Sequence, residues 1–469
     1  MKQFEKVIVL LFLIMLFTSS VSSGEQNTWD CPECGRVGNT GNYCGGCAHP
    51  APWLETFTTP ISFTHTPIST PTLTPTTTTA SKGSSTALGL KYSKISDNEI
   101  TITGYIGRPT DLVIPNYLDN YLVVSISDRA FSNCVSLTSI VIPNSVTTIG
   151  EKSFYWCKNL VSIDMPDSVI SIGDGAFGAC ASLVNVVIPD HVTSIGKRTF
   201  GNCESITDMS IPDSVTVIGD EAFYCCYNLI NVNIPDSVTT IGNDSFSYCY
   251  NLVNITIPDN VTTIGDGAFY NCKSLVDMTI PKSVRVIGKK AFSDCGSLEA
   301  IQVSSENRNL CSVDGVLFDK DRHRLITYPA GKNQTKYEIP STVNIIEECA
   351  FRGCKLINVI IPNSVANIAE YAFSECDSLS NVTIPNSMTS IEQGTFYYCT
   401  ALTRVSIPNS IISIGDSAFY GCSLASVTIP SSVTSIGNRA FFGIEKIYGS
   451  SNSFAQTYAK KNYIPFEAK

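Results

Sequence analysis

The chain repeats one unit of 22 or 23 residues along most of its length, and this period constrains its fold more than any other feature. Each unit contains one proline at the same place, and these are Pro143, Pro166, Pro189, Pro212, Pro235, Pro258 and Pro281, then Pro340, Pro362, Pro385, Pro408 and Pro430. The first series is spaced by 23 residues and the second by 22 or 23. A fixed period in the twenties indicates a solenoid, in which each unit buries its apolar edge only by stacking on its neighbours.

The letters of one unit predict the shape of one coil. In the segment LVNITIP, residues 252–258, the side chains of Leu252, Ile255 and Ile257 are expected to point inward from a short strand. Pro258 ends that strand because it has no N–H for strand pairing. A second apolar stretch, a glycine, a central phenylalanine and a cysteine at a tight corner complete the coil, here Val261, Ile264, Gly265, Phe269 and Cys272. Stacked coils would pair their strands in parallel about 4.8 Å apart.

The repeat resembles that of the BspA-like leucine-rich repeat family of bacterial surface proteins, over roughly residues 90–469. Residues 100–131 look like the opening coil of that family. Residues 311–340 look like its recurrent hairpin insert, with Asp314 and Gly315 as a turn signal. The ending IYGSSNSFAQTYAKKNYIPF resembles its terminal cap. The resemblance implies a leucine-rich repeat solenoid of short parallel strands over 90–449, an insert near 304–339, and a cap over 450–469.

The first 23 residues are typical of a secretory signal peptide. Lys2 and Lys6 precede an eleven-residue apolar run over 7–17, and Val21 and Ser23 are small residues before an expected cut near Gly24. The alternative is an uncleaved N-terminal anchor. The run is short for a transmembrane helix, and no second apolar span follows. We therefore expect a secreted or cell-surface protein whose mature chain has no stable transmembrane span.

Four cysteines in residues 24–53 have the spacing of a metal site. Cys31, Cys34, Cys44 and Cys47 form two CxxC pairs separated by nine residues. Two such pairs can supply four thiolates to one tetrahedral Zn²⁺. A segment this small needs a bound metal or disulfides to fold stably. The pattern resembles small zinc ribbons. The alternative is two disulfides, which suit an oxidising exterior. We predict one structural Zn²⁺ here, followed by a Thr/Pro/Ser-rich spacer over 54–89.

The charge composition and the motif content argue against two classes of function. The formal net charge is −10 with 15% charged residues, whereas nucleic-acid binding requires a basic surface. Catalysis requires a set of residues that the sequence does not bring together. None of the four histidines recurs along the chain together with a plausible nucleophile and a carboxylate. No GxSxG, phosphate-binding or HExxH motif occurs. We therefore predict a non-enzymatic protein that binds no nucleic acid.

Twelve cysteines lie three residues after the repeat phenylalanine, and we call them the cysteine ladder. They are Cys134, Cys157, Cys180, Cys203, Cys226, Cys249, Cys272, Cys295, Cys354, Cys376, Cys399 and Cys422. One interpretation is a redox or metal ladder. We favour buried thiols, because free cysteine is among the most buried residue types and the parallel Cβ vectors of stacked coils suit disulfides poorly. Cys225, Cys311 and Cys349 fall outside the ladder and are candidates for pairing or reaction.

Aspartates after the repeat proline form a second periodic set, which comprises Asp167, Asp190, Asp213, Asp236 and Asp259. Stacked carboxylates can hold Ca²⁺. We favour turn residues on a solvated edge, because asparagine or serine replaces aspartate in other coils without any change of pattern.

Two surfaces are candidates for binding. The strand face carries the outward residues of the first strand, Asn185, Asp208, Asn231, Asn254, Asp277, Asn381 and Arg404, with Ser210, Asn233, Thr256, Thr279 and Thr383. The tyrosine surface follows the phenylalanine corner and comprises Tyr155, Trp156, Tyr224, Tyr227, Tyr248, Tyr250, Tyr270, Tyr397, Tyr398 and Tyr420. Tyrosine and tryptophan are favoured at recognition surfaces. The alternative is that they only cover the corner, and both interpretations stay open at this point.

The leading hypothesis is an extracellular recognition protein, because repeat surfaces suit large partners and the residues for catalysis are scarce. The family resemblance implies adhesion to host, matrix or cell-surface macromolecules, either proteins or glycans. The alternative is a structural or cell-wall-associated scaffold without a specific ligand. Saturable binding that depends on the tyrosine surface would distinguish the first from the second.

Overall fold

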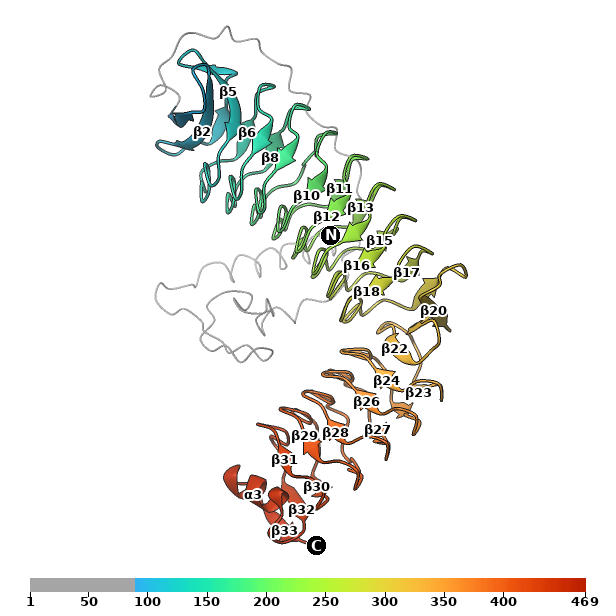
Figure 1. Cartoon of the computed structure of the whole chain (residues 1–469). Helices are drawn as coiled ribbons and strands as arrows, with labels where there is room; N and C mark the ends of the chain where they lie inside the picture. The colour runs from blue at the N-terminus through green and yellow to red at the C-terminus, as the bar shows by residue number, and fades with distance from the viewer. Residues whose placement is uncertain (1–88) are drawn as a thin grey trace, which may run out of the picture. The chain divides into compact units, whose positions relative to one another are not determined.

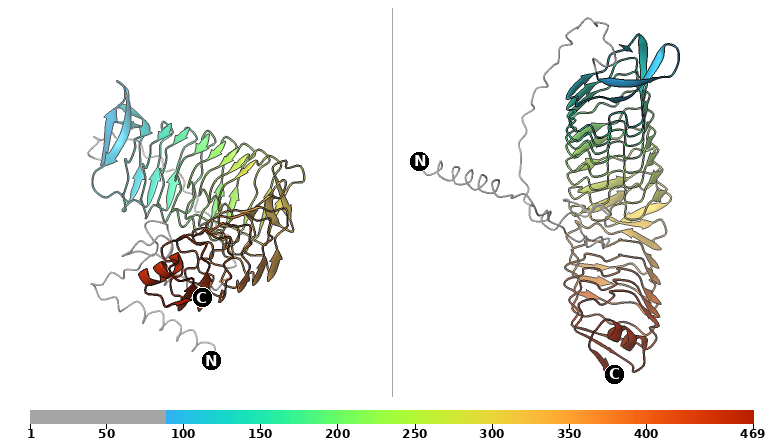
Figure 2. Two further views of the ribbon diagram at one scale, coloured as in Figure 1. Left: turned by 60° about the horizontal axis from the view of Figure 1, so that its bottom comes forward. Right: turned by 90° about the vertical axis from the view of Figure 1, so that its left-hand side faces the viewer.

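The computed structural model describes residues 89–469, which form a β-solenoid of stacked coils (Figures 1 and 2). The predicted signal peptide, the cysteine-rich segment and nearly all of the spacer lie outside the described residues. Two rows of short parallel strands run along the stack, one from each half of the coil. None of the helices within residues 89–469 combines the length and the hydrophobicity of a membrane-spanning segment.

The first row consists of the first strand of each coil, which the repeat proline follows in most coils. Its members are β3 (Asp111–Val113), β6 (Ser139–Val141), β8 (Ser162–Asp164), β11 (Asp208–Ser210), β13 (Asn231–Asn233), β15 (Asn254–Ile255), β17 (Asp277–Ile280), β19 (Ala300–Val303), β23 (Lys336–Glu338), β25 (Asn358–Ile360), β27 (Asn381–Val382), β30 (Ser426–Ile429), β32 (Lys446–Gly449) and β33 (Phe466–Ala468). These strands form five short parallel sheets in which equivalent residues are in register, as Val232 is with Met209 and Ile255.

The second row follows the turn after the proline. Its members are β7 (Thr148–Ile149), β9 (Ser171–Ile172), β10 (Ser194–Ile195), β12 (Val217–Ile218), β14 (Thr240–Ile241), β16 (Thr263–Ile264), β18 (Val286–Ile287), β22 (Arg324–Thr327), β24 (Ile345–Ile346), β26 (Asn367–Ile368), β28 (Ser390–Ile391), β29 (Ser413–Ile414) and β31 (Ser435–Ile436). Each strand buries its isoleucine, or Leu325 in β22, except for the half-buried Ile287 and Ile436.

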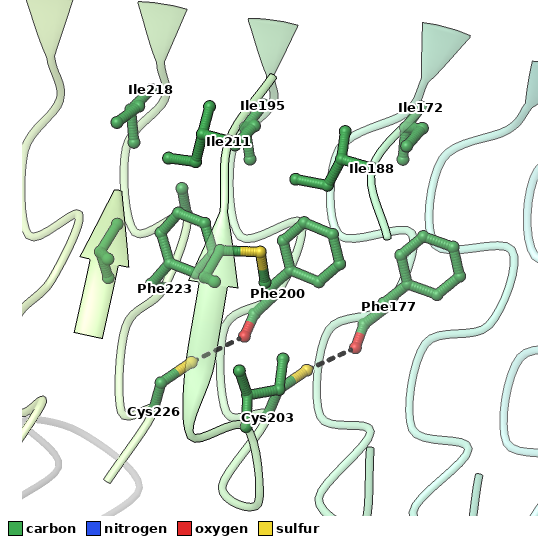
Figure 3. Packing of buried hydrophobic residues seen from close by; sticks show 14 of the residues in the cluster. Ile172, Phe177, Ile188, Ile195, Phe200, Cys203, Ile211, Ile218, Phe223 and Cys226 are labelled. Carbon is green, nitrogen blue, oxygen red and sulfur yellow. Dashed lines mark hydrogen bonds between the residues drawn. The ribbon is translucent and has the colours of Figure 1, made fainter. Parts of the chain in front are cut away.

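The interior between the two rows is filled by columns of identical side chains. The repeat phenylalanines stack with centroids 5.2 to 5.6 Å apart from Phe131 to Phe292, and isoleucines from both rows pack against them (Figure 3). The predicted inward residues Leu252, Ile255 and Ile257 are buried, as is Phe269. The predicted leucine-rich repeat solenoid is thus confirmed for residues 89–469.

The glycine after the second strand allows the coils to approach closely. A Cβ on Gly242 would lie 2.6 Å from the carbonyl carbon of Gly219 and 2.7 Å from the backbone nitrogen of Asp220. Real Cβ contacts are never this short with backbone atoms, so a side chain here would push two coils apart. The repeated glycine is therefore required by packing between coils.

Both ends of the array are covered. At the N-terminal end, β1 (Leu90–Lys94), β2 (Glu99–Tyr105), β4 (Tyr117–Leu118) and β5 (Tyr121–Ile126) join one sheet that continues into β7. At the C-terminal end, helix α3 (Phe454–Lys461) buries Ala455, Tyr458 and Ala459 against the last coils. Such caps are needed because a terminal coil has no neighbour to cover its core.

A hairpin interrupts the array between Phe292 and Phe351. Strands β20 (Leu310–Val313) and β21 (Val316–Asp319) pair antiparallel around Asp314 and Gly315, whose φ angles are 50° and 77°. Strand β21 also pairs antiparallel with β22, which resumes the second row. Tyr328 then takes the place of the repeat phenylalanine and stacks on Phe351 at 5.2 Å.

Candidate functional site

The cysteine ladder is a column of buried hydrogen-bond donors. The fifteen cysteines within residues 89–469 are all free. Each ladder thiol from Cys157 onward donates to the backbone carbonyl of the aromatic residue one coil earlier, for example Cys203 to Phe177 and Cys226 to Phe200, both at 3.2 Å (Figure 3). Burial raises the pKa of the Cys157 thiol to about 12. The interpretation of the ladder as buried thiols is confirmed, with Cys422 alone half-buried.

The three cysteines outside the ladder are also free. Cys225 and Cys349 are buried, and burial raises the pKa of both thiols to about 12. The half-buried Cys311 thiol donates to the carbonyl of Asp319 across the hairpin at 3.2 Å. Of the two possibilities named for these cysteines, pairing does not occur within residues 89–469.

The aspartates after the repeat proline are exposed turn residues, as favoured above. A different column of Asp and Asn side chains connects the coils. Each of these residues directly follows the repeat glycine and accepts a backbone N–H from the next coil. Asp220 accepts the N–H of Asn243 at 2.8 Å, and Asn243 accepts that of Asp266 at 2.8 Å. Sequence reasoning missed this column, although aspartate or asparagine after Ile-Gly marks it. It satisfies backbone donors and so serves stability.

The tyrosine surface contains one large cluster before the insert. Tyr224 contacts Tyr248 edge-on at 5.6 Å, Tyr248 contacts Tyr270 at 5.4 Å, and Tyr227 stacks on Tyr250 at 5.1 Å. Tyr248 is buried, with 5% exposure, whereas Tyr224, Tyr227, Tyr250 and Tyr270 are half-buried. The cluster therefore combines corner covering with partly open aromatic area. Burial raises the pKa of the Tyr224 hydroxyl.

The other predicted aromatics form two separate groups. Tyr397 contacts Tyr398 at 4.8 Å and Tyr420 at 5.3 Å. Tyr155 and Trp156 lie 6.5 Å apart near the N-terminal end, and Trp156 is 54% exposed.

Sequence reasoning missed three members of this corner. Phe442 extends the second group by stacking on Tyr420 at 5.2 Å, and Tyr371 contacts Tyr397 at 6.1 Å. Arg352 places its guanidinium 5.7 Å from the ring centre of Tyr270. Phe442 and Arg352 each follow the repeat aromatic residue directly, as Tyr224, Tyr270 and Tyr420 do. Aligning that single position through all coils would have found them.

The strand face is polar and exposed, as its alternation predicts. Asn231 donates to Asp208 at 2.8 Å, which links side chains of adjacent coils. A partly exposed aliphatic column flanks it, with Val161 at 47%, Ile230 at 37% and Val276 at 39% exposure. This column was also missed, because each residue follows the buried repeat leucine and reads as part of the core.

A family model described as the BspA type leucine-rich repeat region matches residues 124–253, 239–314 and 328–448. The chain belongs to the BspA-type leucine-rich repeat family. These segments contain the columns of phenylalanine, glycine and cysteine described above and both groups of stacked tyrosines.

Solved structures that resemble this BspA-type protein include two that are at least 30% identical to it. A leucine-rich cell surface protein from Faecalibacterium prausnitzii is 33% identical, covers 79% of this chain and 95% of its own, and superposes with a TM-score of 0.65. A leucine-rich repeat protein from Bacteroides ovatus is 30% identical over 81% of this chain and 98% of its own, with a TM-score of 0.52. The pneumococcal vaccine antigen PcpA, at 21% identity, 81% and 97% coverage and a TM-score of 0.52, shares the fold. No curated protein matches the chain.

Proposed function

We propose that this BspA-type protein is a non-enzymatic recognition or adhesion protein, secreted or held at the cell surface, that binds extracellular proteins or glycans. One similar protein is described as a cell surface protein and another as a vaccine antigen. The observation that carries the proposal is the tyrosine cluster on three adjacent coils. Around the buried Tyr248, it presents the half-buried rings of Tyr224, Tyr227, Tyr250 and Tyr270. Tyrosine gives large contact area at low entropic cost.

A binding experiment on the full chain tests this proposal. The immobilised protein is exposed to extracellular-matrix, serum and glycan pools, and we expect saturable binding to one component. The triple variant Tyr227→Ser, Tyr250→Ser and Tyr270→Ser should weaken that binding by roughly thirtyfold or more, since a few aromatic anchors dominate most interfaces. Tyr248 is left unchanged because it supports the others.

The matched control is placed on the strand face. Thr256→Arg and Thr279→Arg add bulk and charge to two exposed positions there and should change the affinity by less than about threefold. Circular dichroism must show that both variants stay folded. If the strand-face variant loses binding and the tyrosine variant keeps it, the ligand lies on the sheet. Absence of saturable binding by the parent protein would favour the scaffold alternative.

We also propose that residues 24–53 hold one structural Zn²⁺ through Cys31, Cys34, Cys44 and Cys47. The support is chemical, since four thiolates in two CxxC pairs form a complete tetrahedral donor set for zinc. These residues lie outside the described part of the chain. Elemental analysis of the full-length reduced protein should find about one equivalent of zinc.

The control for zinc uses the cysteines of the solenoid. Cys31→Ser with Cys44→Ser should abolish the zinc. Cys225→Ser with Cys311→Ser should leave it unchanged, because within residues 89–469 no group of three or more possible metal ligands is present. Two disulfides in the segment and no bound metal would contradict the zinc assignment.

A further inference from the structure

The hairpin insert leaves strand β18 with a neighbour on one side only. Strand β18 pairs in parallel with β16, and among residues 89–469 no strand pairs with its other edge. The N–H groups of Val286 and Gly288 donate to carbonyls of the preceding coil at 3.4 and 2.8 Å. Successive peptide groups of a strand point to opposite sides, so the N–H and C=O of Ile287 point toward the open edge. An unpaired edge is a template for another chain.

A groove runs along this open edge. A cavity of 360 Å³ is lined by β18, by Asn309 and Leu310 at the start of the insert, and by β22. A second cavity of 600 Å³ adjoins it and shares Arg285 and Asn309 with the first. Cavities of this size accommodate ligands larger than an ion. The groove therefore has room for several residues of an extended chain beside β18.

The groove is basic although the chain is acidic. Its charged lining consists of Lys282, Arg285, Lys289, Lys290, Arg308 and Arg324 against Glu306, Asp319, Glu347 and Glu348. The acidic Glu348 pairs with Lys289 and Lys290 at 3.1 and 2.9 Å, and Glu347 pairs with Arg324 at 2.5 Å.

Two arginines of the groove have no such partner. Arg285 and Arg308 are exposed, and neither forms an ion pair within residues 89–469. Guanidinium groups bind carboxylates through two parallel hydrogen bonds. These two side chains are therefore available to anionic groups of a ligand in the groove.

We propose that this groove binds an extended acidic peptide segment of a partner protein, which adds to β18 as a further strand. Its backbone would pair with Ile287 and the carbonyl of Arg285, and its carboxylates would meet Arg285 and Arg308. An acidic polysaccharide satisfies the arginines but lacks regularly spaced N–H groups, and a neutral peptide satisfies only the strand edge. Strand addition of this kind is an established mode of peptide binding. The site shares no residue with the tyrosine surface and goes beyond the function proposed above.

Fluorescence polarisation with the full-length protein tests the two halves of this inference. The probe is a short labelled peptide of alternating Asp and Thr. We expect it to bind, and we expect two relatives to bind at least about tenfold more weakly. One relative replaces Asp with Asn, which removes the charge. The other is N-methylated at every residue, which removes the backbone donors from both edges of the peptide. A sulfated polysaccharide is included as a competitor.

Variants locate the site. Arg285→Gln with Arg308→Gln should weaken the acidic peptide at least about tenfold, whereas Arg404→Gln on the strand face should not. The triple tyrosine variant should bind the peptide like the parent, so failure of the proposed function leaves this result intact. If the N-methylated and parent peptides bind equally well, strand addition is overturned. If the polysaccharide also displaces the peptide, the groove is a site for polyanions. No binding of the acidic peptide would overturn the inference as a whole.

Discussion

Raising the pH above about 8.5 is expected to unfold the solenoid through its thiols. Burial raises the pKa of nine ladder thiols, namely Cys157, Cys180, Cys203, Cys226, Cys249, Cys272, Cys295, Cys354 and Cys399. In the unfolded chain a thiol ionises near pH 8.5. Their stabilising contribution is therefore complete below that pH and is lost as the pH rises toward the folded pKa.

The expected loss of stability is large because nine thiols contribute to it in the same way. Above pH 8.5, each buried thiol lowers the free energy of unfolding of the protein by about 1.4 kcal/mol per pH unit, because the unfolded chain releases a proton that the folded chain keeps. Nine thiols together lose on the order of 10 kcal/mol over the first unit, which is comparable with the whole stability of an ordinary domain. Chemical denaturation at a series of pH values under reducing conditions measures this slope, and we expect steep destabilisation between pH 8.5 and 10.

A serine variant separates thiol ionisation from other alkaline effects. Cys203→Ser, Cys226→Ser and Cys249→Ser keep a donor for the carbonyls one coil earlier but do not ionise in this range. The slope above pH 8.5 should fall by about 4 kcal/mol per pH unit, whatever the cost of the substitutions at pH 7. An unchanged slope would show that the thiols do not carry the pH dependence. The same comparison below pH 8 should show no difference in slope.

The fold was predictable from sequence because every coil repeats the same constraints. Inward Leu252, Ile255 and Phe269 recur at fixed intervals, so one coil determines the next. The candidate binding site was harder to predict, because outward-facing side chains from several neighbouring coils form it together. The sequence suggests that Tyr248 is one more surface aromatic. Its backbone, however, has a φ of 62°, and its side chain is 5% exposed and in edge-on contact with Tyr224 and Tyr270. Burial at that position follows from stacking between coils, which the unit alone does not reveal.

The interruption shows the same limit more clearly. Asn307 appears in the sequence as a polar loop residue, but it is buried and its amide donates to the carbonyls of Pro281 and Val284 at 2.8 and 2.9 Å. Where the period breaks, contacts join residues that no repeat relates. The open edge of β18 and the ion pairs of Arg352 both arise there, and neither has an equivalent in the regular coils.

Replacing Arg352 with methionine is expected to destabilise the junction across the insert by about 3–5 kcal/mol. The Arg352 side chain is 9% exposed, and its guanidinium donates to Asp294 at 2.6 Å, before the insert, and to Glu375 at 2.7 Å, after it. It also lies over the ring of Tyr270. Methionine fills similar volume but leaves the carboxylate of Asp294 largely buried without its cation. Denaturant unfolding should show either a lower midpoint or a separate early transition.

The matched control for Arg352→Met is Arg324→Met, at the neighbouring strand β22. Arg324 also bonds to a glutamate, Glu347, at 2.5 Å, but its side chain is 55% exposed. Exposed ion pairs contribute about 0–1 kcal/mol because water screens them and both side chains lose freedom. The control should therefore cost less than about 1 kcal/mol. Equal costs for the two variants would mean that burial does not strengthen the Arg352 pairs. A restored midpoint in Arg352→Met with Asp294→Asn would confirm that the uncompensated carboxylate causes the loss.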